Sequence, residues 1–109
     1  MTEILFYHLE NQPLERVLPT LLSKSLERGW KAAVQVGDSD RLEPLDTLLW
    51  TYSDESFLPH AVSDGKNDEA QPILLTDTVA NPNGAAVRFL VYGAAIDDAS
   101  GYERVIHMF

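Results

Sequence analysis

The chain has 109 residues, of which 45% are apolar, and a formal net charge of −9 from 17 acidic and 8 basic residues. This length and apolar content predict one compact domain over residues 1–109 that can bury its own core. The basic residues are scattered without a run or stripe, so we expect no direct nucleic-acid binding. The absence of cysteine excludes disulfides and thiolate chemistry. We see no signal peptide and no apolar run of membrane-spanning length, and therefore expect a soluble, cytoplasmic protein with no membrane partner.

The first predicted elements are a strand and a helix. The apolar residues 4–7 predict a strand that begins almost at the first residue. Leucine and valine recur at three- and four-residue steps from Leu14 to Leu26, which predicts a helix that ends at Gly29. Pro19 does not suit a helix interior, so it predicts either a kink or a helix that starts near Thr20.

A second strand and helix follow in the middle of the chain. Residues 32–36 predict a short, central strand. Asp38 and Ser39 offer side chains that can cap a helix, and the leucine pattern continues that helix to about Trp50. Pro44 falls in its first turn or so, where proline is tolerated.

The second half of the chain predicts strands without long helices. We expect a solvated loop at 63–71, strands at 73–76, 87–92 and 104–109, a turn at 81–84, and a short helical turn within 97–101. Strands and helices that alternate along a chain imply a mainly parallel sheet with helices packed on it. The chain stops at Phe109 inside an apolar run, so we expect a missing C-terminal helix, removed by truncation or supplied by a partner.

A nucleotide site is the first function to test in an α/β chain. The loop after the first strand, residues 8–13, has no glycine and contains Glu10. The loop after the second strand has Gly37 alone, followed by Asp38 and Asp40. Phosphate-binding loops need glycines and exposed backbone N–H groups near a helix N-terminus. We therefore expect no nucleotide and no other cofactor.

The other patterns also give no catalytic residue. His8, His60 and His107 have no metal-ligand spacing, and structural roles are the simpler interpretation, with His60 in a loop after a proline. No G-x-S-x-G elbow occurs. The acidic pairs at 68–69 and 97–98 are typical of solvated loops. The sequence thus predicts neither a metal site nor an enzyme.

The segment Leu45–His60 is the most informative part of the chain. Trp50 ends the second helix, and Phe57-Leu58-Pro59-His60 follows a polar turn in backbone that proline keeps out of helix. Trp50 and Phe57 could be core residues, or they could be exposed anchors for a partner, since aromatic side chains are enriched at binding hot spots. The sequence leaves both interpretations open.

These residues resemble the chi subunit family of bacterial DNA polymerase III. The matching motifs are F-Y-H-L at 6–9, P-L-E-R-V-L-P-T-L-L with W-K at 30–31, and L-D-T-L-L-W followed by D-E-S-F-L-P-H, which ends at His60. The resemblance implies a three-layer α/β/α sandwich with nucleotide-binding-like topology but no phosphate loop. It also implies a non-catalytic accessory subunit of the clamp loader in DNA replication. Such a subunit bridges the replicase to the acidic, phenylalanine-ended C-terminal tail of single-stranded DNA-binding protein, and binds the psi subunit where one exists.

The resemblance also assigns partner-binding residues. At one point, the C-terminal end, this chain departs from the family pattern. It associates Trp50 and Phe57 with partner docking, and we add the neighbouring Leu58, Pro59 and His60 as contact candidates. The tail-binding basic and aromatic residues of the family lie largely on a C-terminal helix that would follow Phe109. Phe109 itself is a candidate for the apolar part of the tail pocket. With a charge of −9 and no basic cluster, the chain is expected to be a poor receptor for an acidic tail.

Two alternatives remain beside the replication subunit. One is a small α/β enzyme whose ligand site the sequence does not reveal. The other is a structural domain of a larger assembly, which would dimerise through an uncovered sheet face. The absence of every catalytic pattern and the resemblance, which centres on Leu45–His60, favour a contact role over a core role for this segment.

Overall fold

The computed structural model describes residues 2–9, 14–51, 60–63, 68–78, 81–96 and 101–109. The elements in chain order are β1 (Glu3–Tyr7), α1 (Leu14–Glu27), β2 (Ala32–Val36), the 3-10 turn η1 (Ser39–Arg41), α2 (Leu42–Thr51), β3 (His60–Val62), the 3-10 turn η2 (Asp68–Ala70), β4 (Ile73–Thr76), β5 (Val87–Val91) and β6 (Arg104–Met108). The predicted strands and both predicted helices are therefore present. The helical turn expected within 97–101 falls mostly outside the described residues.

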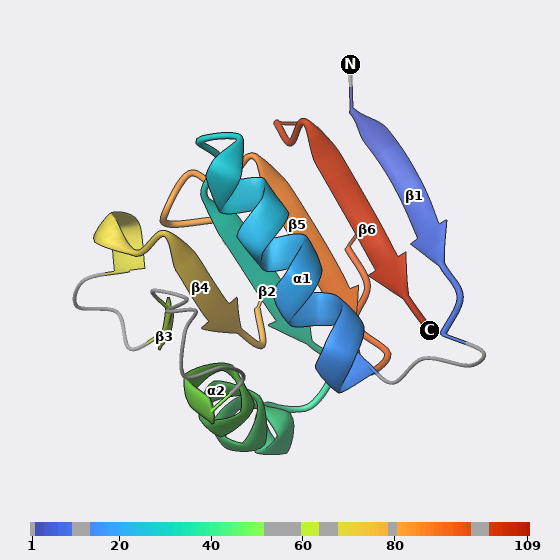
Figure 1. Cartoon of the computed structure of the whole chain (residues 1–109), viewed down its shortest axis with the longest axis vertical. Helices are drawn as coiled ribbons and strands as arrows, with labels where there is room; N and C mark the ends of the chain where they lie inside the picture. The colour runs from blue at the N-terminus through green and yellow to red at the C-terminus, as the bar shows by residue number, and fades with distance from the viewer. Residues whose placement is uncertain (1, 10–13, 52–59, 64–67, 79–80, 97–100) are drawn as a thin grey trace.

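The six strands form one parallel sheet in the order β1-β6-β5-β2-β4-β3 (Figure 1). β2 lies in the interior of the sheet, as predicted, and all five of its residues are buried. The first and last strands of the chain are neighbours, so β1 is an edge strand that pairs only with β6. The expected α/β class with a mainly parallel sheet is confirmed.

Helix α1 runs without interruption through Pro19, so the prediction of a later start near Thr20 is wrong. An interior proline removes one backbone hydrogen bond and costs about 3 kcal/mol. Leu18 and Leu22, which flank it, are fully buried. Complete burial of a leucine stabilises by roughly 1.5–3 kcal/mol, so the two together offset the cost of the proline.

Helix α2 starts as its sequence predicts. Asp38 has extended backbone angles, and its carboxylate accepts a hydrogen bond from the N–H of Asp40 at 3.0 Å. This cap begins the 3-10 turn η1, which leads directly into α2. Pro44 is the third residue of α2, within its first turn, where proline is tolerated.

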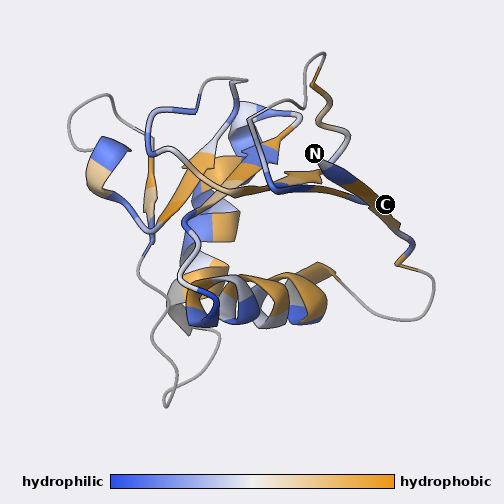
Figure 2. Ribbon diagram, turned by 90° about the horizontal axis from the view of Figure 1, so that it is seen from above, coloured by the Kyte–Doolittle hydropathy of each residue, from blue (hydrophilic) through white to orange (hydrophobic). Residues whose placement is uncertain are grey.

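The core lies mainly between the sheet and the two helices. Alternate strand residues face α1 and α2, and the buried set includes Val34, Leu75 and Phe89 from three neighbouring strands. Figure 2 shows α1 on one side of the sheet and the connections between strands on the other. On that second face a smaller cluster forms from Leu90, Tyr102 and Val105. The described part of the second layer thus consists of irregular connections rather than long helices.

Two expectations about the middle of the chain need correction. His60 lies not in a loop but at the start of β3, a three-residue strand too short to show an alternating pattern. The loop expected at 63–71 contains η2, in which Asp68 is buried and accepts a hydrogen bond from the hydroxyl of Ser63 at 2.6 Å. A buried carboxylate needs such a hydrogen-bond partner. The burial of Asp68 was not predicted because the segment around it is polar and acidic, which is typical of a solvated loop.

One arginine is completely buried in the second layer. Arg88 of β5 donates from Nε and Nη2 to the side-chain oxygen of Gln35 at 2.9 and 2.7 Å, and from Nη1 to the hydroxyl of Tyr102 at 3.1 Å. It also donates to the carbonyl oxygen of Thr78. Because Thr78 and Tyr102 belong to different connections, this cation fastens both connections to the sheet.

Candidate functional site

The aromatic segment singled out in the sequence is described only in part. Trp50 lies in the last turn of α2, but its side chain is outside the described part of the structure. Phe57, Leu58 and Pro59 also lie outside the described residues. The choice between core and contact for these four residues therefore stays a prediction.

His60, at the end of that segment, has a structural setting. Its side chain is fully buried, and its Nε2 lies 3.1 Å from Oδ1 of Asp46 and 3.2 Å from the carbonyl oxygen of the same residue. Asp46 belongs to α2, so the imidazole fastens β3 to that helix. Any role of His60 in partner binding would be indirect, through the position of the preceding segment.

Phe109 is exposed on the edge of the sheet beside β1. Its backbone N–H donates to the carbonyl oxygen of Tyr7 at 3.0 Å, while 60% of the residue remains accessible. Its ring lies 6.5 Å from that of Phe6, which is 70% exposed. Together with Ile4, these residues form an exposed apolar edge patch, defined here as Ile4, Phe6 and Phe109. Surfaces of this kind commonly contact other proteins.

Two of the three histidines meet at the same edge. The ring of His107 stacks on Phe6 at 5.0 Å, and that of His8 lies 5.1 Å from Phe109. The rings alternate with phenylalanine rather than converging on a point. Among the described residues, no three histidine, cysteine or acidic side chains are grouped as metal ligands.

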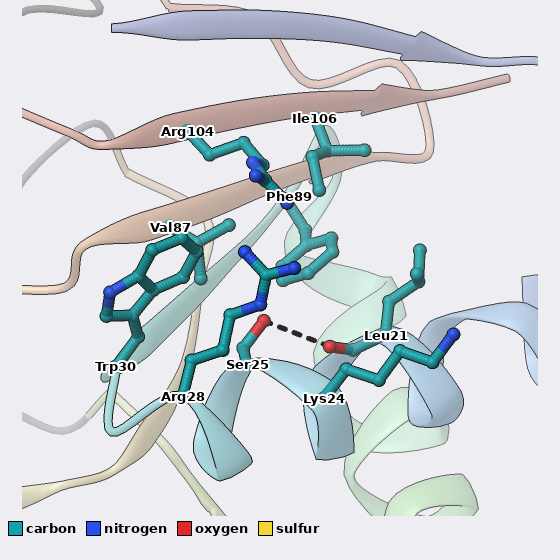
Figure 3. A pocket seen from close by; sticks show the side chains of 9 residues that line it. All are labelled: Leu21, Lys24, Ser25, Arg28, Trp30, Val87, Phe89, Arg104 and Ile106. Carbon is teal, nitrogen blue, oxygen red and sulfur yellow. Dashed lines mark hydrogen bonds between the residues drawn. The ribbon is translucent and has the colours of Figure 1, made fainter. Parts of the chain in front are cut away.

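A basic hollow lies on the face of the sheet that α1 covers, between the end of α1 and strands β5 and β6 (Figure 3). Its volume is about 70 Å³. Three cations and one indole surround a largely apolar floor, and the full lining is Leu21, Lys24, Ser25, Arg28, Trp30, Val87, Phe89, Arg104 and Ile106. Among the described residues no acidic side chain belongs to this lining, although Oε1 of Glu3 lies 2.8 Å from Nε of Arg104.

Secondary structure explains how the three cations meet. Lys24 lies in the last turn of α1, and Arg28 directly follows the helix, where its backbone N–H donates to the carbonyl oxygen of Lys24 at 3.2 Å. The two residues are therefore one helical turn apart on the same side. Arg104 is the first residue of β6, and its register places it beside Val87 at the start of β5. The parallel sheet thus brings Arg104 under the end of α1. Figure 3 shows the guanidinium groups of Arg28 and Arg104 turned toward the hollow, while Lys24 extends away from Trp30.

Trp30 lies between the two arginines. The central guanidinium carbon of Arg28 is 5.2 Å from the ring centroid of Trp30, and that of Arg104 is 5.4 Å from it. Both distances are within the range of a cation–π interaction. Two positive charges therefore share one indole.

The expectation that the chain has no basic cluster is wrong in three dimensions. The cations are scattered in the sequence, and Arg104 joins the other two only through the pairing of β6 with β5. The i, i+4 pair of Lys24 and Arg28 followed by Trp30 was a signal that sequence reasoning could have used. Nothing in the sequence near Arg104 indicated that it would join the other two cations.

The place where a nucleotide would bind in such a fold is tightly packed at Gly37. In an open parallel sheet, ligands bind beyond the carboxyl ends of two neighbouring strands whose connections diverge, here β2 and β5. Gly37 follows β2, and a Cβ placed on it would lie 2.3 Å from the carbonyl oxygen of Tyr92, which follows β5. The amide of Gln35 also donates to the carbonyl oxygen of Ala95 at 3.1 Å. The backbone that follows β5 therefore packs directly against the end of β2 at this point.

Neither α1 nor α2 has the length and hydropathy of a helix that crosses a membrane, and they are the α-helices in the described residues.

Comparison with known proteins identifies relatives of this chain. The model of the family described as DNA polymerase III chi subunit, HolC, matches residues 1–109. A protein from Rickettsia prowazekii (strain Madrid E), named probable DNA polymerase III subunit chi, is 31% identical over 91 residues. The aligned region is 84% of this chain and 55% of that relative, so the chain spans little more than half of the relative's length.

Proposed function

Because the chain belongs to the DNA polymerase III chi subunit family, we propose that it is a non-catalytic accessory subunit of the clamp loader in the bacterial cytoplasm. In this role it links the replicase to single-stranded DNA-binding protein during replication. A psi subunit is a second partner where one is present. The membership in a polymerase subunit family supports the replication role, while the partners are part of the proposal.

The close packing of backbone at Gly37 is the observation that carries the non-catalytic part of the proposal. A parallel α/β sheet usually binds its ligand where the connections of two adjacent strands diverge. Here Gly37 is pressed against the backbone of Tyr92, and Asp38 adds a negative charge directly after it. Both features oppose a phosphate group, so we assign the chain a protein-binding role.

We place partner contacts on the aromatic segment and on the exposed edge of the sheet. The first set of proposed contacts is Trp50, Phe57, Leu58 and Pro59, and it is followed in the chain by the buried His60, which lies against Asp46. The second is the edge patch, in which Phe109 and Phe6 are each more than half exposed. Aromatic side chains bury a large area at little conformational cost, which suits them to act as binding anchors.

The test is co-purification of the tagged chain with clamp-loader subunits and with single-stranded DNA-binding protein. We expect both partners to be retained, and we expect Trp50→Ala and Phe109→Ser each to weaken retention of at least one. Single-stranded DNA-binding protein that lacks its acidic tail is the matched control for the second partner. Circular dichroism must show that each variant is folded.

Two results would contradict this function. One is failure of the folded, unmodified chain to retain any clamp-loader subunit. The other is a nucleotide or metal that native mass spectrometry finds bound to the purified protein, which would favour the small-enzyme alternative. A symmetric dimer without replication partners would favour the structural-domain alternative instead.

A further inference from the structure

One edge of the sheet is open to pairing with another strand. We propose that β1 pairs in antiparallel fashion with β1 of a second copy of this chain, which gives a weak dimer with two-fold symmetry. The proposal goes beyond the proposed function and does not rest on it. It rests on the exposure of β1, the direction of its backbone groups and its self-complementary sequence.

β1 lacks the features that usually protect an edge strand. Among the described strands it pairs only with β6, so its other side faces outward (Figure 1). All five of its residues are exposed, and four of them are large and apolar: Ile4, Leu5, Phe6 and Tyr7. Proteins commonly protect a free edge with lysine, proline, a bulge or a very short strand. β1 has none of these, whereas β3 at the opposite edge has only three residues.

The backbone of β1 decides which of its residues can form a new ladder. The N–H of Glu3 donates to the carbonyl oxygen of the residue before β6 at 3.1 Å, and the carbonyl oxygen of Tyr7 accepts from the N–H of Phe109 at 3.0 Å. Glu3 and Tyr7 therefore use these backbone groups on the β6 side. Because successive residues of a strand direct their backbone groups to opposite sides, those of Ile4 and Phe6 point to the outer edge.

Two antiparallel copies of β1 have one register in which all five residues of each strand are paired. In this register Ile4 of one copy exchanges two backbone hydrogen bonds with Phe6 of the other, and the two-fold symmetry repeats that pair. Leu5 lies on the symmetry axis opposite Leu5 of the second copy, and Glu3 lies opposite Tyr7. Residues that lie opposite one another share a face of the sheet, so the apolar side chains of the two copies are in contact.

The charge on β1 is compatible with this register, although each chain carries −9. The only carboxylate of the strand, on Glu3, already lies 2.8 Å from Nε of Arg104 in the same copy. In the dimer it also faces the hydroxyl of Tyr7 of the second copy, which can donate a hydrogen bond to it. The Glu3 residues of the two copies are about 13 Å apart along the ladder. That separation exceeds the screening length of about 10 Å at 0.1 M salt, so their mutual repulsion is small.

The exposed area predicts a weak dimer. Phe6 is 70% exposed and Tyr7 is 37% exposed, which together leave about 150–250 Å² open on each copy, the area of one aromatic side chain. Ile4 and Leu5 are 50% and 38% exposed and add aliphatic area. The dimer interface is therefore smaller than the roughly 1,200 Å² that stable complexes bury, and we expect a dissociation constant of about 10–100 μM.

Sedimentation equilibrium of the full chain between about 1 μM and 1 mM, a range that brackets this affinity, measures the dimer. We expect monomer at the low end and dimer at the high end. Raising the salt concentration from about 0.05 M to about 0.5 M should strengthen association, because salt screens the repulsion between two chains of charge −9. A monomer at every concentration, or a dimer that salt weakens, would overturn the proposal.

Phe6→Ser tests the strand itself. It should weaken the dimer roughly a hundredfold, because symmetry removes two rings and each loss is about tenfold. Phe109→Ser is the matched control: Phe109 belongs to the same exposed patch but lies beyond β6 rather than on β1. This control should change the dissociation constant by less than about threefold, as expected for a contact at the margin. Equal losses in the two variants, with both folded by circular dichroism, would overturn pairing through β1.

Leu5→Cys tests the register and does not depend on the loss of a contact. The chain has no other cysteine. In a non-hydrogen-bonded antiparallel pair the two Cα atoms at this position are about 4.5 Å apart, which falls within the range of about 4.4–6.8 Å that a disulfide spans. With oxidised glutathione we expect this variant to form a disulfide-linked dimer.

Tyr7→Cys is the control for the cross-link. Tyr7 lies on the same face of β1 as Leu5 and has nearly the same exposure, 37% against 38%. In the proposed register its copies are about 13 Å apart, too far for a disulfide. Cross-linking of Tyr7→Cys as complete as that of Leu5→Cys would overturn the register and with it the proposal.

The dimer and the proposed function can fail separately. The dimer covers Ile4 and Phe6 of the edge patch, so a replication partner that docks on this patch competes with the second copy. If Leu5→Cys forms a disulfide-linked dimer while the chain retains no replication partner, only the proposed function fails. If the chain retains replication partners but Leu5→Cys forms no dimer at any concentration, the second copy is the wrong occupant of this edge.

Discussion

Replacing Gln35 with leucine should strongly destabilise the fold, because it removes the side-chain oxygen that accepts two hydrogen bonds from the buried cation of Arg88. The side-chain oxygen of Gln35 accepts two hydrogen bonds from Arg88, at 2.9 and 2.7 Å, and neither residue is more than 5% exposed. Hydrogen bonds to charged groups contribute about 1.5–3 kcal/mol each. Removing one partner of a buried charge typically costs about 3–5 kcal/mol, a large share of the roughly 5–15 kcal/mol that stabilises a domain.

The measurement is urea unfolding followed by tryptophan fluorescence. Gln35→Leu is expected to lose about 3–5 kcal/mol, and Gln35→Glu should lose less because it keeps an acceptor for Arg88. In the double variant Gln35→Leu with Arg88→Leu, the charge is gone, so the total loss should fall short of the sum of the single losses by about 1–3 kcal/mol. A loss below about 1 kcal/mol in Gln35→Leu, the range of an ordinary net hydrogen bond, would refute the reasoning. Strict additivity in the double variant would also refute it.

Three further variants test other parts of the structure. Gly37→Ala places a Cβ 2.3 Å from the carbonyl oxygen of Tyr92 and should lower stability by at least about 1–3 kcal/mol in thermal unfolding, whereas an unchanged melting temperature would mean that the two backbones do not touch. Asn83→Ala removes buried hydrogen bonds to the carbonyl oxygens of Ala32 and Gln71, at 3.1 and 3.0 Å, and should cost about 2 kcal/mol in urea unfolding. Phe6→Ser, at a residue that is 70% exposed, should change stability by no more than about 0.5 kcal/mol while it weakens retention of a replication partner in co-purification. A strongly destabilised Phe6→Ser would show that the ring is part of the core.

Local sequence patterns were sufficient for most of the secondary structure. The repeat of leucine and valine at three- and four-residue steps predicted α1, and Asp38 predicted the start of the turn that leads into α2. Such patterns succeed because they depend on contacts between residues close in the chain. They failed at Pro19, where burial of neighbouring leucines outweighs a local penalty, and at β3, which pairs with β4 but is too short to show a period.

The candidate site likewise has parts that local sequence patterns predict and parts that depend on contacts between distant residues. The sequence by itself determined the α/β class, the lack of a glycine-rich phosphate loop, and the motifs that resemble the chi family. Only the tertiary structure decided that Arg104 joins Lys24 and Arg28 around Trp30, because strand order and register, rather than spacing along the chain, place β6 beneath the end of α1. It also decided that the apolar run of β1 is exposed, since an edge position follows from the pairing of all six strands and leaves no local trace.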